Sequence, residues 1–245
     1  MDRLSIVKGD IAKMKTEAIV NAANTSLLGG GGVDSAIHRS AGSELLKECE
    51  QIGGCPTGEA RLTKGYKLNA KYVIHTPGPI WRGGQKGEEE LLTNCYKNSL
   101  ALAEEKGIKS IAFPSISTGV YRFPVEKAAE IALKEITGFL ASHKDFEKIV
   151  IVCFDDNTLK QYKSVLKKFQ SKLNRPSKTF RAVFYILLFT SCFINSSKNI
   201  WNFSSFSLLL ALCLVLLFPA ILTCFATWRS KSIRSIFSGV YKKPF

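Results

Sequence analysis

The chain has 245 residues, with 34 Lys and Arg against 20 Asp and Glu, and its net charge of +14 is unevenly distributed. Residues 171–245 contain 10 of the basic residues and no acidic residue, whereas residues 1–170 carry 24 basic and 20 acidic residues, a net charge of +4. The basicity therefore belongs mostly to the C-terminal part, and it gives no reason to expect the first 170 residues to bind nucleic acid.

Segments typical of strands and of helices alternate through residues 1–170. Strands are predicted at residues 4–7, 18–21, 60–63, 72–75, 110–114 and 148–154. Helices are predicted at residues 33–49, 88–106, 125–143 and 157–169. This alternation predicts an α/β domain in which a mostly parallel sheet is covered by helices on both faces.

Four loops of this predicted domain are the place to look for function. The carboxyl ends of parallel strands meet at one edge of a sheet, and α/β proteins bind their ligands there. The loops that leave predicted strands at this edge are residues 21–34, 76–81, 115–123 and 154–157. We therefore expect the functional site to be built from them.

The first of these loops contains four consecutive glycines, residues 29–32, directly before a helical pattern that begins at Val33. Glycine permits positive φ angles and a close approach to a ligand. Free N–H groups at a helix N-terminus, together with the helix dipole, attract anions and above all phosphate. A flexible turn is the alternative. However, Asn21, Asn24 and Asp34 bring amide and carboxylate groups to the same edge, which favours a phosphorylated, hydroxyl-rich ligand.

A second loop of this kind follows the strand at residues 110–114. Gly119 frees its backbone, Ser117 and Thr118 offer hydroxyl groups, and a helix begins close behind it near Val125. Alone, this pattern is typical of an ordinary strand–helix connection. Two such loops on neighbouring strand ends suit a diphosphate better than a monophosphate.

Other side chains at the strand ends leave two interpretations open. Asp10 can accept a hydrogen bond from an exocyclic amine such as that of adenine, or it can cap a helix. Phe154 can stack on a base, or it can pack in the core. We interpret His75 as part of a rigid structural turn and His38 as a core histidine.

The chain has seven cysteines and no CxxC pair. Cys49 and Cys55, even with His38 nearby, match no closed tetrahedral zinc pattern, so neither a metal nor a cofactor is expected. No secretory pattern occurs at the N-terminus, and free thiols fit a reducing compartment. We therefore expect residues 1–170 to be cytoplasmic.

The motifs of the first 170 residues resemble those of a macro domain, most closely the MacroD type that includes bacterial O-acetyl-ADP-ribose deacetylases. The segments that carry the resemblance are residues 9–11, 18–24, 28–34, 36–38, 55–60, 75–79 and 117–121. They occur in the expected order and spacing. The resemblance implies a three-layer α/β/α fold with a mostly parallel, mixed sheet that binds ADP-ribose.

The resemblance also implies roles for individual residues. Asp34 would be the catalytic carboxylate, Asn24 would hold the distal ribose, and Tyr121 would close over that ribose. Asp10 would lie at the adenine amine and Phe154 near the base. The other ligand-binding residues, which include those of the two loops around the diphosphate, would be Ile11, Asn21, Gly30, Gly31, Gly32, Val33, Ser117, Thr118, Gly119 and Val120.

The implied function is hydrolysis of an ester on the distal ribose. The substrate would be O-acetyl-ADP-ribose, a protein with mono-ADP-ribose on Asp or Glu, or both. Asp34 would orient or deprotonate the attacking water, and backbone amides of the glycine loop would offset the developing negative charge. The alternative is an ADP-ribose reader without catalysis, which needs no carboxylate at position 34. Two positions depart from the family pattern: Ser35, where glycine is common, and Arg122, where a small residue is frequent.

Residues 171–245 differ in composition from the rest of the chain. Residues 171–181 form a basic linker, and residues 182–245 a hydrophobic tail with a weak candidate membrane span at 182–197 and a stronger one at 206–228. Basic residues flank this pair of segments, which predicts a helical hairpin with both ends cytoplasmic. A membrane anchor is the prediction, and a translated frameshift or readthrough product is the alternative.

Overall fold

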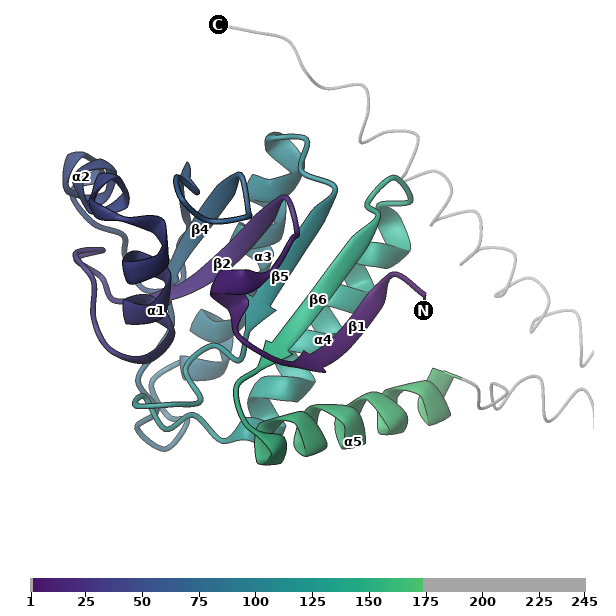
Figure 1. The fold of residues 1–245 in the computed structure, drawn as a ribbon. Coiled ribbons are helices and arrows are strands. Elements are labelled where there is room, and N and C mark those ends of the chain that lie inside the picture. The colour runs from purple at the N-terminus through teal and green to yellow at the C-terminus, as the bar shows by residue number, and fades with distance from the viewer. Residues whose placement is uncertain (1, 174–245) are drawn as a thin grey trace, which may run out of the picture. The chain divides into compact units, whose positions relative to one another are not determined.

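A computed structural model describes residues 2–173, and Met1–Lys172 form one compact unit (Figure 1). The expected basic linker and both expected membrane segments lie outside the described residues, apart from residues 171–173, so they stay predictions. Within residues 2–173, no helix is both long enough and apolar enough to cross a membrane.

A six-stranded sheet forms the centre of the unit. Its strands are β1 (Leu4–Lys8), β2 (Ala18–Ala23), β3 (Arg61–Lys64), β4 (Tyr72–Pro77), β5 (Ser110–Pro114) and β6 (Lys148–Cys153). They lie in the order β1-β6-β5-β2-β4-β3, and every neighbouring pair is parallel except β3 with β4. The predicted mostly parallel, mixed sheet is confirmed.

Helices cover both faces of this sheet (Figure 1). They are α1 (Gly32–Ala41), α2 (Ser43–Ile52), α3 (Glu88–Glu105), α4 (Val125–Ser142) and α5 (Asp156–Leu173), with a short 3-10 helix, η1 (Ile11–Lys13). One hydrophobic core joins α3, α4 and α5 to the sheet, and a second joins α1, α2 and η1 to it. The predicted three-layer α/β/α architecture is therefore confirmed.

The two cores explain why the central strands read as unbroken apolar runs. Successive side chains of a strand point to opposite faces of the sheet. In β6, Ile149 and Ile151 belong to the core under α3, α4 and α5, whereas Val150 and Val152 belong to the core under α1 and α2. Both faces are buried, so both sets of side chains are apolar.

The single helix predicted at residues 33–49 is wrong, because the chain breaks it into α1 and α2. Gly42 separates the two helices with a φ of +90°, and its N–H donates to the carbonyl of His38 at 3.1 Å. Ala41 and Leu45, on either side of the break, are both buried in the same core. The apolar spacing therefore continues across the break and resembles one helix face. A glycine that ends a helix was the available signal.

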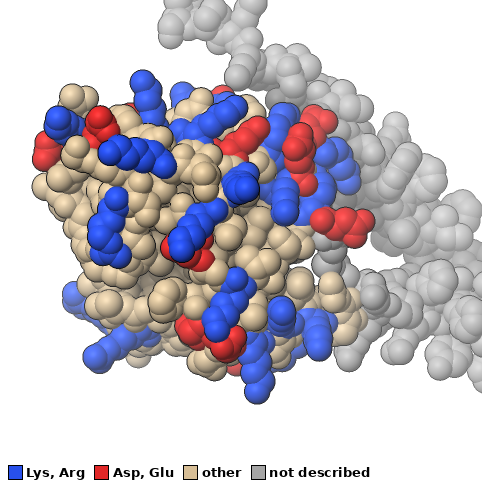
Figure 2. Space-filling view, in the orientation of Figure 1, with Lys and Arg blue, Asp and Glu red and all other residues tan. Residues whose placement is uncertain are grey.

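The surface of the unit carries both signs of charge. On the face shown in Figure 2, Lys and Arg side chains are interspersed with Asp and Glu over the described residues. This mixture agrees with the small net charge of residues 1–170.

Two glycines offer a test of how tightly the unit is packed. A Cβ at Gly65 would lie 1.8 Å from the carbonyl oxygen of Ala70, so Gly65→Ala must move backbone and should lower the free energy of unfolding by about 3 kcal/mol. Gly138, in the interior of α4, meets nothing within 4 Å, and Gly138→Ala should raise it by about 0.5–1 kcal/mol. Urea unfolding of the full-length chain measures both. Equal effects of the two substitutions would contradict the packing.

Candidate functional site

Four of the strand ends form the edge at which a site was expected. The exposed large apolar side chains among residues 2–173 are Leu28, Tyr66, Ile80, Val120 and Phe154. All of them except Tyr66 belong to the loops that follow β2, β4, β5 and β6. Exposed apolar side chains on loops that meet at one edge indicate a ligand-binding face.

Asn24 organises the turn that leads from β2 to the glycines. Its Oδ1 accepts hydrogen bonds from the N–H groups of Ser26 and Leu27, both at 3.0 Å, and from Ser26 Oγ at 2.7 Å. Its Nδ2 donates to the carbonyl of Gly29 at 2.7 Å. Leu27 is fully buried with a φ of +63°, a strained conformation for leucine that these bonds stabilise.

Asp34 lies in the first turn of α1 with its carboxylate almost fully buried. Its Oδ1 accepts a hydrogen bond from Asn21 Nδ2 at 2.6 Å and lies 3.3 Å from His38 Nε2. Its Oδ2 has no hydrogen-bond partner among the described residues. A Cβ at Gly30 would lie 3.0 Å from this oxygen and 3.2 Å from Asn24 Nδ2. The free oxygen and the Asn24 amide therefore face the same stretch of glycine backbone.

A buried network supports Asp34 from behind. Asn21 and His75 are register partners on β2 and β4, and Asn21 Nδ2 lies 3.1 Å from His75 Nδ1. Because this amide gives one hydrogen to Asp34, it gives the other to His75 Nδ1, which must accept. The His75 proton then sits on Nε2, which lies 2.9 Å from Thr63 Oγ1 and 3.9 Å from Cys49 Sγ.

His75 is therefore neutral in the folded protein. Burial, and then the neighbouring His38, lower the pKa of His75 to about 4, although Asp34 opposes both effects. His75 lies in β4, as the predicted strand at residues 72–75 has it, so the rigid turn does not begin there, and its side chain belongs to the network of the candidate catalytic carboxylate. Its signal in the sequence was an imidazole directly after the apolar residues Val73 and Ile74 of the strand.

The same network contains the donor atoms for a metal ion. The ligand atoms of His38, Cys49 and His75 all lie within 4.8 Å of one another, and Cys55 is not part of this group. Burial, and then the charge of Asp34, raise the pKa of Cys49 to about 11, so its sulfur is a thiol in this arrangement. Thiolate is the form that binds metals. In this structure the three side chains belong to the hydrogen-bonded network that supports Asp34.

The loop after β5 contains a residue with a strained backbone conformation, and hydrogen bonds fix the loop in place. Ser117 is buried with a φ of +64°, and its Oγ has no partner among the described residues. Thr118 Oγ1 donates to the carbonyl and to Oγ of Ser115, at 3.0 and 2.8 Å. The carbonyl of Tyr121 accepts from the N–H of Trp81 at 2.9 Å, which ties this loop to the one after β4.

The two departures from the family pattern have different surroundings. Ser35 Oγ accepts a hydrogen bond from the Arg39 guanidinium one turn further along α1. Arg122 is exposed with a φ of +55°, and its N–H donates to the carbonyl of Gly119 at 2.9 Å. Only glycine, which lacks a Cβ, adopts such a φ without strain, so Arg122 stands at a strained position of the backbone.

Asp10, Ile11 and Phe154 lie at the ends of β1 and β6, which are neighbours in the sheet. Asp10 caps η1, and its Oδ1 accepts from the N–H of Ala12 at 3.0 Å. Ile11 is buried in the core under α1, so only its backbone faces the edge. Phe154 is 81% exposed, which excludes the core role that the sequence had left open.

Comparison with known proteins decides the family. A family model described as "Macro domain" matches residues 20–132. The O-acetyl-ADP-ribose deacetylase of Escherichia fergusonii is 51% identical over 168 residues, which cover 67% of this chain and 95% of that protein. This chain belongs to the macro domain family.

Solved structures agree with this assignment. A macrodomain of Oceanobacillus iheyensis with ADP is 48% identical and has a TM-score of 0.67. The match covers 69% of this chain and 92% of the Oceanobacillus iheyensis chain. A macrodomain of Trypanosoma brucei in complex with ADP-ribose is 44% identical, has a TM-score of 0.63, and its match covers 67% of this chain and 69% of that one.

Strand order arranges the predicted site residues of this macro domain in a row. Asp10 and Phe154 follow β1 and β6 at one end, the loop with Ser117, Thr118, Gly119, Val120 and Tyr121 follows β5 in the middle, and Asn24 follows β2. The glycines Gly30, Gly31 and Gly32 lead from there to Val33 and Asp34 in the first turn of α1. All of these residues therefore belong to one continuous edge, as expected.

Neutral His75 makes the stability of the macro domain depend on pH. The unfolded chain binds a proton at His75 near its ordinary pKa of 6.5, and the folded chain only near pH 4. The contribution of neutral His75 to the free energy of unfolding is thus complete above pH 6.5. About 3 kcal/mol of that free energy is lost as the pH falls to 4. Urea unfolding from pH 4 to 7 should show a shallower decline for His75→Gln. His143→Gln, at a partly exposed histidine, is the control. Parallel declines for all three proteins would contradict this account.

Proposed function

We propose that this macro domain binds ADP-ribose and hydrolyses esters on its distal ribose. O-acetyl-ADP-ribose is one substrate, and proteins that carry mono-ADP-ribose on Asp or Glu are another. The name of the Escherichia fergusonii relative and the ADP-ribose complex of the Trypanosoma brucei macrodomain support this function. The observation that carries it is the buried Asp34 carboxylate, whose free Oδ2 faces the Asn24 amide across Gly30.

The two oxygens of Asp34 have separate tasks in the proposed reaction. Asn21 holds Oδ1 at 2.6 Å, so the carboxylate cannot rotate without losing that bond. Oδ2 is left to accept a proton from a water molecule that attacks the acyl carbon of the ester. The proton then passes to the ribose oxygen as its bond to the acyl carbon breaks, which releases the acid and the ribose hydroxyl.

The remaining loops hold the nucleotide. Asn24 uses one Nδ2 hydrogen to fix the turn, which leaves the other to bind the distal ribose. The N-terminus of α1 at Gly31 and Gly32 and the open backbone at Gly119 present amides to the diphosphate. Backbone amides near the reacting ester stabilise the negative charge that develops on its carbonyl oxygen.

Asp34→Asn separates an enzyme from a reader. The amide keeps the shape of the side chain but cannot take a proton, so kcat for O-acetyl-ADP-ribose should fall by about 100-fold or more while ADP-ribose still binds. Chromatographic assay of deacetylation and calorimetric titration of ADP-ribose, on full-length protein, measure the two effects. Asp145→Asn, at an exposed carboxylate before β6, is the control. Wild-type turnover by Asp34→Asn, or none by the wild type, would contradict the proposal.

Gly30 provides a second test that leaves the carboxylate in place. In Gly30→Ala the new methyl group would press on Asp34 Oδ2 and Asn24 Nδ2, which should lower kcat roughly tenfold or more. Gly31→Ala is the matched comparison, because a Cβ there meets nothing within 4 Å. The effect on kcat should be clearly larger at Gly30. Equal losses would show that the contact with Asp34 is unimportant.

A further inference from the structure

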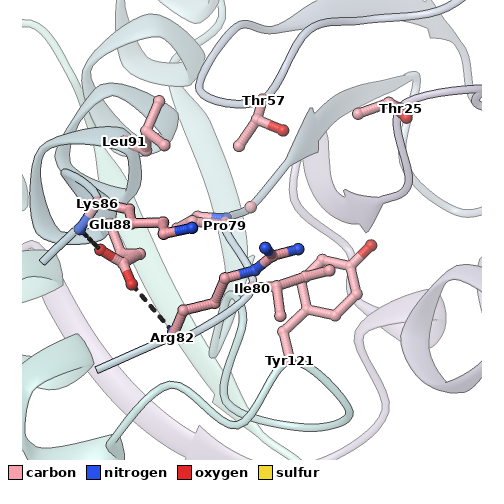
Figure 3. A pocket seen from close by; sticks show the side chains of 10 residues that line it. Thr25, Thr57, Pro79, Ile80, Arg82, Lys86, Glu88, Leu91 and Tyr121 are labelled. Carbon is pink, nitrogen blue, oxygen red and sulfur yellow. Dashed lines mark hydrogen bonds between the residues drawn. The ribbon is translucent and has the colours of Figure 1, made fainter. Parts of the chain in front are cut away.

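A cavity of about 320 Å³ adjoins the catalytic end of the macro domain, and no step of the proposed reaction uses it (Figure 3). Thr25, the residue after Asn24, and Tyr121, which is expected to close over the distal ribose, both line it. With Tyr121 over the distal ribose as expected, the cavity lies beside the group esterified to that ribose.

Two cations face this cavity without an acidic partner. The side chains of Arg82 and Lys86 line it, and Figure 3 shows both extending into the space, with the Arg82 guanidinium toward Ile80 and Tyr121. Neither side chain forms an ion pair with a carboxylate among residues 2–173. Cations that line a cavity unpaired are available to an anionic ligand.

Glu88, the carboxylate in the cavity wall, is occupied by backbone instead of by these cations. It accepts hydrogen bonds from the N–H groups of Arg82 at 2.9 Å, Gly84 at 3.2 Å and Lys86 at 2.6 Å. Burial alone would raise the pKa of Glu88, but these amides hold it below its ordinary value. An ionised Glu88 therefore fixes the loop that presents Arg82 and Lys86.

We propose that this cavity binds acidic side chains of the polypeptide next to the ADP-ribosylated Asp or Glu, so that the enzyme prefers modified residues in an acidic sequence context. This inference rests on the proposed function. An acetyl group is uncharged and small, and it needs neither two cations nor a cavity of this size. A polypeptide extends beyond the ester, and the hydroxyl groups of Thr25 and Thr57 suit its backbone.

Two peptides of equal length test the preference. Each carries one ADP-ribosylated Glu, which is flanked by Asp and Glu in the first peptide and by Asn and Gln in the second. Full-length wild-type protein should show a kcat/KM about fivefold higher for the acidic peptide, the effect of two ion pairs at the exposed side chains of Arg82 and Lys86. The preference should fade as salt is raised.

Charge removal in the cavity should abolish the preference. In the double variant Arg82→Gln/Lys86→Gln the ratio of the two kcat/KM values should fall to near one. Because both peptides meet the same preparation, changes in folding or active fraction cancel in this ratio. Lys144→Gln/Lys148→Gln is the matched control, since it removes two exposed charges at the amino end of β6, and it should keep the wild-type ratio.

The possible failures are distinguishable. Equal kcat/KM values of the wild type for the two peptides, or an unchanged preference in Arg82→Gln/Lys86→Gln, would overturn the cavity's role and leave the proposed function standing. Turnover of O-acetyl-ADP-ribose without turnover of either peptide would overturn the role of the cavity and the protein substrate together. No turnover of any of the three substrates would overturn the proposed function itself.

Discussion

The hydrogen bond between Asn21 and Asp34 joins the interior of the sheet to the edge at which we propose that the ligand binds. Asn21 is fully buried on β2, and β2 is paired on both sides, with β4 and β5. An amide on such a strand has no freedom to follow a moving carboxylate. The bond to Asn21 therefore fixes the carboxylate of Asp34 relative to the sheet, and its free oxygen faces the glycine backbone at Gly30.

This bond in turn requires a neutral histidine. A protonated His75 would present an N–H to the amide of Asn21 at 3.1 Å, and two donors would face each other inside the core. Asn21 could then remain only by turning its carbonyl oxygen toward His75. Because the same Nδ2 faces both partners, this turn would also remove the N–H that Asp34 needs. The protonation state of His75 and the orientation of the Asp34 carboxylate therefore depend on each other through Asn21.

Local patterns in the sequence predict much of this arrangement. Apolar periodicity and the positions of glycines report which segments form strands and helices, and the carboxyl edge of a parallel sheet follows from their alternation. The break at Gly42 escapes because Ala41 and Leu45 keep helical spacing across it. His75 escapes because its partner Asn21 lies on another strand, 54 residues away, and pairing between strands has no local signature. The unpaired state of Arg82 depends on which amides occupy Glu88, and only folding decides that.

The strand order has a consequence for the size of the ligand. Neighbouring strands are separated by about 4.8 Å, so the row from β1 through β6, β5 and β2 to β4 is about 19 Å long. The width of the sheet thus sets the length that a ligand needs in order to reach every loop of the row. A molecule that reaches only from Asp10 to the loop after β5 can fill the nucleotide end without reaching Asp34, the proposed catalytic carboxylate. The length of the ligand, as much as its chemical identity, therefore decides whether a molecule that binds at this edge is a substrate or an inhibitor.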